Sequence, residues 1–428
     1  MNKREIIENK LLGEKLVRIR HRSGLDIYVL NKEFTEYTAF FGTRYGSCDS
    51  TLTDSNGHTS TVPAGIAHFL EHKMFESPDG EDVSAGFAAL GADANAYTSA
   101  DTTVYLFTCT ERFYEALELL IKMVTTPYFT PENVKKEKGI ISEEIRMCRD
   151  SVSDALHYLL MGAMYGEHPA AVPIAGTVDS ISKITPSLLY ACYNSYYRSS
   201  NMVMSVCGRI DPDEVERVVD RALPGKETPK VIFDRHKDTI ECARKRAERE
   251  MEVSIPVFRI GIKYPEGDFP AACQVLSEIL FGECEELYCS LYEKGLLSEN
   301  YSYGYACRRT APYFAVGGDS DDPEAVFEAF CEYAGRLRER GVSAEALERA
   351  RRVMYADALK SLDSAEAAES IFDSAILGME PLGRAEEFLA VTIEDVNALA
   401  GRVLSPERFA MSVVYPKAAE NKKSVKKI

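Results

Sequence analysis

The chain has 428 residues, of which 45% are hydrophobic and 27% are charged, a composition typical of a soluble globular protein. This length suits two domains of about 200 residues better than one. The formal net charge of −17 argues against binding to nucleic acid or anionic membranes. It favours basic peptides electrostatically, although solubility alone would also account for it.

Residues 1–5 lead into a polar stretch with no apolar signal region, so we expect no secretion. No apolar run approaches the roughly 18–20 residues that a membrane helix needs. Eleven cysteines are scattered without a C-x-x-C pair, and their number is odd. This usage indicates free thiols in a reducing cytoplasm rather than a disulfide framework.

Short runs rich in β-branched and aromatic residues predict three strands near the N-terminus, at 15–20, 26–31 and 38–45. A polar loop follows over 47–61. Pro63 then precedes a segment that Pro78-Asp79-Gly80 ends, so we predict one short helix over 65–75.

The predicted helix over 65–75 carries the candidate metal site. His68 and His72 are four residues apart, so both imidazoles can reach one ion from the same face. Two neutral imidazoles at this spacing suit zinc. Glu71 lies beside His72, where it can hold a water molecule without being a ligand. The order H-x-x-E-H is the inverse of the H-E-x-x-H zinc helix. Taken alone, these residues also fit a solvated helix face.

Seven further elements are predicted in the first half: helices at 83–90, 111–124, 131–149, 186–197 and 212–222, and strands at 102–109 and 202–207. Thr130-Pro131 and Thr185-Pro186 each place a capping residue before a proline at the first helical position.

A zinc hydrolase needs a third protein ligand and one open coordination position. The helix over 131–149 offers four glutamates, Glu132, Glu137, Glu143 and Glu144. Glu137 and Glu144 are two turns apart and share a face, whereas Glu143 is rotated by about 100°. We predict Glu144 as the ligand and Glu137 as a carboxylate that braces the ligands. We interpret Glu132 and Glu143 as surface charges.

A charged stretch low in periodic apolar residues divides the chain. We predict an N-terminal zinc-binding domain over 1–225, a linker over 226–250 and a C-terminal domain over 251–428 without a metal. The second half opens with a strand over 257–264, and its segment 323–360 repeats the helix pattern of 111–149.

The internal repeat predicts an α+β fold with two homologous domains that enclose a cleft. Each domain is expected to hold a mostly antiparallel sheet covered on one face by helices. All seven histidines lie at or before His236, so the second half cannot build a histidine metal site. In the repeat, Glu144 falls opposite Asp357 and Glu137 opposite Ala350.

Five motifs resemble those of the pitrilysin/insulinase family of zinc peptidases, the inverzincins. They keep the family order and cover the first half, while the second half matches by pattern only. They are His68-Phe69-Leu70-Glu71-His72, Gly91…Asn95-Ala96-Tyr97-Thr98, Glu137-Lys138-Gly139-Ile140-Ile141-Ser142-Glu143-Glu144-Ile145, Ile174-Ala175-Gly176 and Tyr196-Tyr197…Asn201-Met202…Gly208.

The resemblance implies a LuxS/insulinase-like metallopeptidase fold with Zn2+ as cofactor. It makes His68, His72 and Glu144 the ligands and Glu71 the catalytic base. It also places Asn95 and Ala96 on an edge strand to which a peptide substrate adds as an extra β-strand. Short members, similar to mitochondrial-processing-peptidase-like proteins, are expected to form dimers whose two chains enclose a chamber.

One feature departs from the family pattern. The family stabilises the oxyanion with an Arg and a Tyr seven residues later, from the other half of the chamber. Here Tyr292 and Glu299 fall at those positions, and Arg408 and Tyr415 have the spacing but lie on the predicted final strand. This departure implies a heterodimer in which a paralogous partner carries the pair.

We therefore predict a zinc-dependent endopeptidase that cuts short or unfolded peptides in a closed chamber. One alternative is a proteolytically silent subunit that serves as a binding or assembly module. The other is the maturation of one dedicated peptide.

Overall fold

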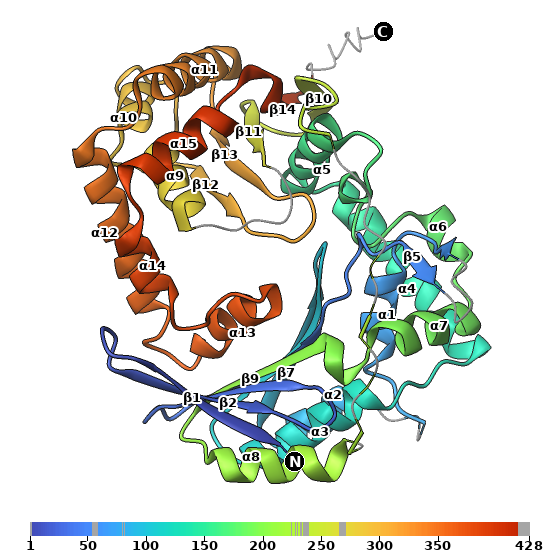
Figure 1. Cartoon of the computed structure of the whole chain (residues 1–428). Coiled ribbons are helices and arrows are strands. Elements are labelled where there is room, and N and C mark those ends of the chain that lie inside the picture. The colour runs from blue at the N-terminus through green and yellow to red at the C-terminus, as the bar shows by residue number, and fades with distance from the viewer. Residues whose placement is uncertain are drawn as a thin grey trace, which may run out of the picture.

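The computed structural model describes residues 2–53, 59–78, 80, 82–223, 225–226, 228, 230–231, 233, 239–264 and 271–417. The predicted linker over 226–250 lies partly outside these residues. Figure 1 shows two halves, each with one large sheet and its own helices, that form the arms of a curved molecule. No helix of the described part is long and apolar enough to span a membrane.

The first sheet has seven strands in the order β1-β2-β3-β9-β4-β8-β7. The β3–β9 pair is parallel, and the other pairs are antiparallel. The edge strand β1 was not predicted, because its sequence is mostly charged and exposed. The strands are β1 Lys3–Asn9, β2 Glu14–Arg20, β3 Asp26–Asn31, β4 Tyr37–Thr43, β7 Ala92–Thr98, β8 Thr103–Cys109 and β9 Met202–Gly208. A separate ribbon pairs β5 Thr51–Thr53 with β6 Thr59–Thr61.

The second sheet has five strands in the order β10-β14-β11-β13-β12. This order matches β3-β9-β4-β8-β7 strand by strand, and the parallel pair β10–β14 corresponds to β3–β9. The predicted α+β fold of two similar, mostly antiparallel halves is therefore confirmed. The strands are β10 Arg246–Met251, β11 Val257–Lys263, β12 Tyr301–Ala306, β13 Tyr313–Asp319 and β14 Phe409–Pro416. Since β10 begins at Arg246, part of the segment predicted as a linker is a strand, while the domain limits stay a prediction.

In both halves, two helices precede the strand pair β7–β8 or β12–β13, and a series of helices follows it. Those of the first half are α1 Ile66–Lys73, α2 Val83–Ala89, α3 Phe113–Thr125, α4 Pro131–Arg149, α5 Val152–Tyr165, α6 Val178–Ser182, α7 Pro186–Tyr196 and α8 Pro212–Ala222. Those of the second half are α9 Ala271–Phe281, α10 Glu286–Glu293, α11 Pro323–Arg340, α12 Ala344–Lys360, α13 Ala367–Leu377, α14 Arg384–Ala390 and α15 Ile393–Val403. Short 3₁₀ turns lie at Pro169–Ala171, Ser199–Asn201 and Pro406–Arg408.

Helices α5 and α13 exchange places between the halves. Each follows a long helix, α4 or α12, and each packs on the sheet of the other half. Phe372 of α13 lies against Phe40 of the first sheet, with ring centroids 6.0 Å apart. Leu160 of α5 belongs to the same buried cluster as Ala410 of β14. The prediction that helices cover one face of each sheet is thus wrong, because the exchanged helix covers the second face.

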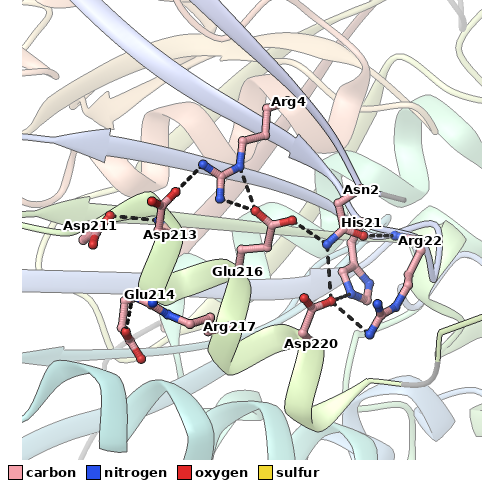
Figure 2. Close-up of polar contacts among 10 residues, drawn as sticks. All are labelled: Asn2, Arg4, His21, Arg22, Asp211, Asp213, Glu214, Glu216, Arg217 and Asp220. Carbon is pink, nitrogen blue, oxygen red and sulfur yellow. Dashed lines mark hydrogen bonds and ion pairs between the residues drawn. The ribbon is translucent and has the colours of Figure 1, made fainter.

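Polar contacts fasten the N-terminal segment to α8, as Figure 2 shows. Arg4 of β1 donates from Nε to Glu216 at 2.7 Å and also pairs with Asp213. At the turn between β2 and β3, the buried ring of His21 lies 2.9 Å from a carboxylate oxygen of Asp220. These contacts hold the edge of the first sheet against the last helix of its half.

Candidate active site

Two glycines set the position of α1. Gly65, at φ +92°, precedes the helix, and a Cβ on it would lie 2.5 Å from the carbonyl oxygen of Ala175. Gly176, at φ +73°, would place a Cβ 2.4 Å from the carbonyl oxygen of Ala64. Only glycine fits both the left-handed conformation and this close approach of two backbones. The Ile174-Ala175-Gly176 segment therefore lies directly against the start of the predicted metal helix.

The structure brings His68, His72 and Glu144 together from α1 and α4. One Glu144 carboxylate oxygen lies 3.3 Å from Nε2 of His68, and the other lies 3.5 Å from Nε2 of His72. One ligand atom from each of the three residues lies within 4.8 Å of the other two. Two imidazole nitrogens and a carboxylate oxygen form the donor set of a catalytic zinc site. The chemistry of the residues present therefore fits this ion.

Glu137 lies behind His72, as the shared helix face suggested. Its Oε1 is 3.1 Å from Nδ1 of His72, and its Oε2 is 3.7 Å from Nζ of Lys73. When Nδ1 of His72 donates to this carboxylate, the lone pair of Nε2 faces Glu144. Lys73 is fully buried and pairs with Glu76 at 2.6 Å. No pattern in the sequence indicates a role for Lys73, because its burial depends on the packing of α1 against α4.

Glu71 points from the same helix into a setting suited to a base. It is only 8% exposed, and Oγ1 of Thr98 donates a 2.6 Å hydrogen bond to its Oε2. Burial raises the pKa of Glu71, although His68 and the Thr98 hydrogen bond act in the opposite direction. A carboxylate of raised pKa accepts a proton more readily at neutral pH. Thr98 belongs to one of the matched motifs, but no role was predicted for it.

The charges around the two imidazoles attract a cation. The pKa of Glu144 is lowered, chiefly because it accepts a hydrogen bond from His68. Burial disfavours the charged form of His72, yet the hydrogen bond to Glu137 and the neighbouring carboxylates outweigh it and raise the pKa of His72. Burial likewise opposes the ionised form of Glu137, but its contacts with His72 and Lys73 keep the pKa of Glu137 lowered. Three carboxylates beside two imidazoles thus leave the group net negative.

Asn95 and Ala96 lie on β7, the strand at one edge of the first sheet. The amide oxygen of Asn95 accepts a 2.8 Å hydrogen bond from the N–H of Ala96. Ala96, Tyr97 and Thr98 line the cavity that contains His68, His72 and Glu144, the metal group. An edge strand beside a cavity has unpaired backbone groups to which a peptide can add.

Comparison with known proteins places the chain in a family. A family model described as insulinase (peptidase family M16) matches residues 56–178, and a second, described as the peptidase M16 inactive domain, matches residues 183–354. The uncharacterized zinc protease YmfH of Bacillus subtilis is 37% identical, over 96% of this chain and 99% of that protein. The chain belongs to the insulinase family of peptidases. His68, Glu71, His72 and Glu144 all lie within the first match.

Solved structures of insulinase-family proteins have the same fold. An M16-like peptidase from Alicyclobacillus acidocaldarius has a TM-score of 0.90 and 33% identity, covering 96% of this chain and all of the other. Pitrilysin has a TM-score of 0.77 at 14% identity and covers 97% of this chain but only 46% of its own. A second relative, the uncharacterized zinc protease YmxG of Bacillus subtilis, is 27% identical over 84% of this chain and 90% of that protein.

The Arg and Tyr expected from the insulinase family do not lie in the metal cavity. Tyr292 is 58% exposed on α10. Arg408 is buried and donates from Nη1 to the carbonyl of Lys263 at 3.2 Å, while the Tyr415 hydroxyl accepts a 2.6 Å hydrogen bond from Arg246. Arg408 and Tyr415 therefore belong to the framework of the second sheet.

The metal cavity has a volume of about 640 Å³ and reaches beyond the predicted residues. Tyr158 of α5 lines it, and the Tyr158 hydroxyl accepts a 3.0 Å hydrogen bond from the N–H of Ile174. Three arginines, Arg149, Arg244 and Arg249, line it as well. Sequence reasoning missed Arg244 and Arg249 because both fall in the segment read as a linker.

Proposed function

We propose that this insulinase-family chain is a zinc-dependent endopeptidase that hydrolyses short or unfolded peptides inside a closed chamber. The observation that carries the proposal is the convergence of His68, His72 and Glu144 on one point of a cavity, with Glu71 alongside. A silent binding module would not need a buried carboxylate of raised pKa at that place. The free state of all eleven cysteines supports a reducing compartment, for which we propose the cytoplasm.

The residues of the site have separate roles in the proposed reaction. His68, His72 and Glu144 would hold zinc, which when bound supplies a Lewis acid that polarises the scissile carbonyl and acidifies water. Glu71 takes a proton from the attacking water and returns it to the leaving amine. Thr98 holds the Glu71 carboxylate through its 2.6 Å hydrogen bond. The edge of β7 at Asn95 and Ala96 aligns the substrate backbone as an added strand.

We further propose that the chain acts as the zinc-bearing subunit of a heterodimer. Arg408 and Tyr415 form hydrogen bonds within the second sheet, and Tyr292 occupies the sequence position at which the family has the arginine. A paralogous chain that carries the Arg and Tyr would supply the oxyanion contacts and close the chamber. Preorganised donors of this kind are worth about 10²–10³ in rate, so the isolated chain is expected to be a weak peptidase.

The test is hydrolysis of a quenched fluorescent peptide mixture by the purified chain with zinc, alone and with the paralogue. The expected result is weak cleavage alone and strong cleavage with the partner. Glu71→Gln should retain zinc, measured by mass spectrometry, and lose about 10²–10⁴ of the rate. Glu143→Gln is the matched control, since Glu143 is an exposed glutamate of α4 paired with Arg146.

Two outcomes would contradict parts of this proposal. Full activity of the chain alone, abolished by Glu71→Gln, would support the peptidase and exclude the need for a heterodimer. Bound zinc without cleavage, even after addition of the paralogue, would exclude the peptidase and favour a silent subunit.

A further inference from the structure

We propose that the metal cavity contains a carboxylate-binding subsite formed by Arg244 and Arg249. This subsite would select peptides that carry an acidic side chain, or their terminal carboxylate, close to the scissile bond. The use of the subsite in catalysis rests on the proposed peptidase function. The existence of the subsite as a binding site does not depend on that function, because peptide binding and peptide hydrolysis are measured separately.

The three arginines of the cavity have no counter-ion among the described residues. In the part of the chain that the structure describes, no ion pair or side-chain hydrogen bond is formed by Arg149, Arg244 or Arg249, although all three line the metal cavity. Arg246, on the same strand as Arg249, instead pairs with Glu248 at 3.0 Å and with Glu324. An arginine without a counter-ion inside a concave site is available to a ligand.

The strand β10 explains why Arg249 faces the cavity. Successive side chains of a strand point to opposite faces, so Arg249 shares a face with Ala247 and Met251. Both of these residues are buried in clusters that contain α5. The Arg249 side chain therefore lies on the α5 side of β10, where it lines the metal cavity, whereas Arg246 lies on the other face.

Arg244 is held over the same helix. Its backbone N–H donates to the carbonyl of Ala163 at 2.9 Å. A guanidinium nitrogen of Arg244 lies 3.4 Å from the position that a Cβ on Gly162 would occupy. The absence of a side chain at Gly162 thus leaves room for the guanidinium along α5. The charged wall is therefore formed by β10 of the second sheet and by α5, which packs on that sheet, whereas the predicted metal ligands come from α1 and α4.

The placement of the charges in the cavity, rather than their sum, favours an anion on this wall. Three carboxylates line the cavity, but Glu71 accepts from Thr98 and Glu144 contacts both imidazoles. With Asp154, the formal charges of the three carboxylates equal those of the three arginines, but Glu71 and Glu144 come from α1 and α4, whereas Arg244 and Arg249 come from β10 and the residues just before it. The overall charge of −17 favours basic peptides at long range, whereas the guanidinium groups of Arg244 and Arg249 favour a carboxylate beside β10. Guanidinium groups bind carboxylates through paired N–H donors, so a peptide carboxylate is the ligand that this wall fits.

The test is equilibrium binding of labelled peptides to the zinc-loaded chain in a Glu71→Gln background, followed by fluorescence anisotropy. Three peptides differ only in a central Glu, Gln or Lys and have amidated C-termini. A fourth has the central Gln and a free C-terminal carboxylate. The peptides with a central Glu or a free C-terminal carboxylate are expected to bind more tightly than the amidated Gln peptide, and the Gln peptide more tightly than the Lys peptide. This preference should weaken at high salt. The fourth peptide distinguishes a terminal from a side-chain carboxylate.

Charge reversal assigns the preference to the two arginines. Arg244→Glu and Arg249→Glu should each lower the ratio of affinities for the Glu and Lys peptides about threefold to tenfold, the effect expected of a partly solvated ion pair. Arg249→Lys should retain most of the preference. Arg209→Glu is the control, since Arg209 is 58% exposed outside the cavity and pairs only loosely with Glu33 at 3.3 Å.

The outcomes separate this subsite from the proposed enzyme activity. Equal affinities for the peptides, no measurable binding, or a preference unchanged by both charge reversals would overturn the subsite. Carboxylate-dependent binding without hydrolysis by the Glu71-containing dimer would retain the subsite and reject the peptidase. Hydrolysis at the same rate for peptides of different charge would support the peptidase and reject the subsite.

Discussion

At the scale of single residues, we expect the metal group to depend on Glu137, which touches no predicted ligand atom of the ion. It contacts Nδ1 of His72 at 3.1 Å and Nζ of Lys73 at 3.7 Å. The hydrogen bond selects the tautomer of His72 that presents Nε2 to the metal position. Burial opposes the ionisation of Glu137, but His72 and Lys73 together keep the pKa of Glu137 lowered. We therefore propose Glu137 as a positioning residue.

Replacing Glu137 with Gln is expected to weaken zinc binding about 10-fold to 100-fold, because a neutral amide holds the imidazole less firmly. Competition with a chelating dye measures the affinity, and circular dichroism checks the fold. Glu143→Gln, on the same helix but exposed and paired with Arg146, should leave the affinity unchanged. Equal zinc affinities for the two variants would show that Glu137 does not position His72.

The residues of the site differ in how far the sequence reveals them. His68 and His72 are four residues apart, so spacing alone suggests that they share a face of α1, and Glu71 follows His68 by one turn. Glu144 follows from the periodicity of α4 once a third ligand is sought. Thr98 could not be assigned in this way, because its contact with Glu71 joins β7 to α1 across 27 residues. Arg244 and Arg249 enter the cavity only through the position of β10 over α5.

At the scale of elements, the exchange of α5 and α13 could not be read from the sequence. The caps of α4 and α7 predict where these helices begin, but α5 was missed. One side of α5 packs on the second sheet and another lines the metal cavity. Apolar residues on several faces weaken the periodicity that marks a surface helix. Docking of α13 on the first sheet likewise joins segments more than 150 residues apart.

The exchange predicts that a residue of the second half stabilises the first sheet. Phe372 of α13 is fully buried against Phe40, and the missing side chain of Gly42 leaves space for its ring. Phe372→Ala is expected to lower the free energy of unfolding by about 3–5 kcal/mol, because it leaves a cavity between helix and sheet. Val353→Ala, at a 39% exposed position on α12, should change it by less than about 1 kcal/mol. Urea unfolding measures both, and similar losses would argue against tight docking of α13.

At the scale of the whole molecule, the exchanged helices make the two halves one folding unit despite their separate sheets. The second face of the first sheet buries Leu16, Tyr28, Leu30 and Val104 beneath α13. Without the second half, this apolar face would be open to water, and α5 would lose the sheet on which it packs. Exposed apolar surface of this extent is a source of aggregation.

We therefore expect the full chain to unfold in urea in one transition, with the same midpoint by fluorescence and by circular dichroism. A fragment of residues 1–225 retains every predicted metal ligand but lacks α13, so it should aggregate or unfold without cooperativity. Zinc should not rescue it, because metal ligation restores no cover for the open face of the sheet. A soluble fragment with a sigmoidal urea transition, or two separated transitions in the full chain, would mean that each half is stable alone. The exchanged helices would then contribute little to the coupling between the halves.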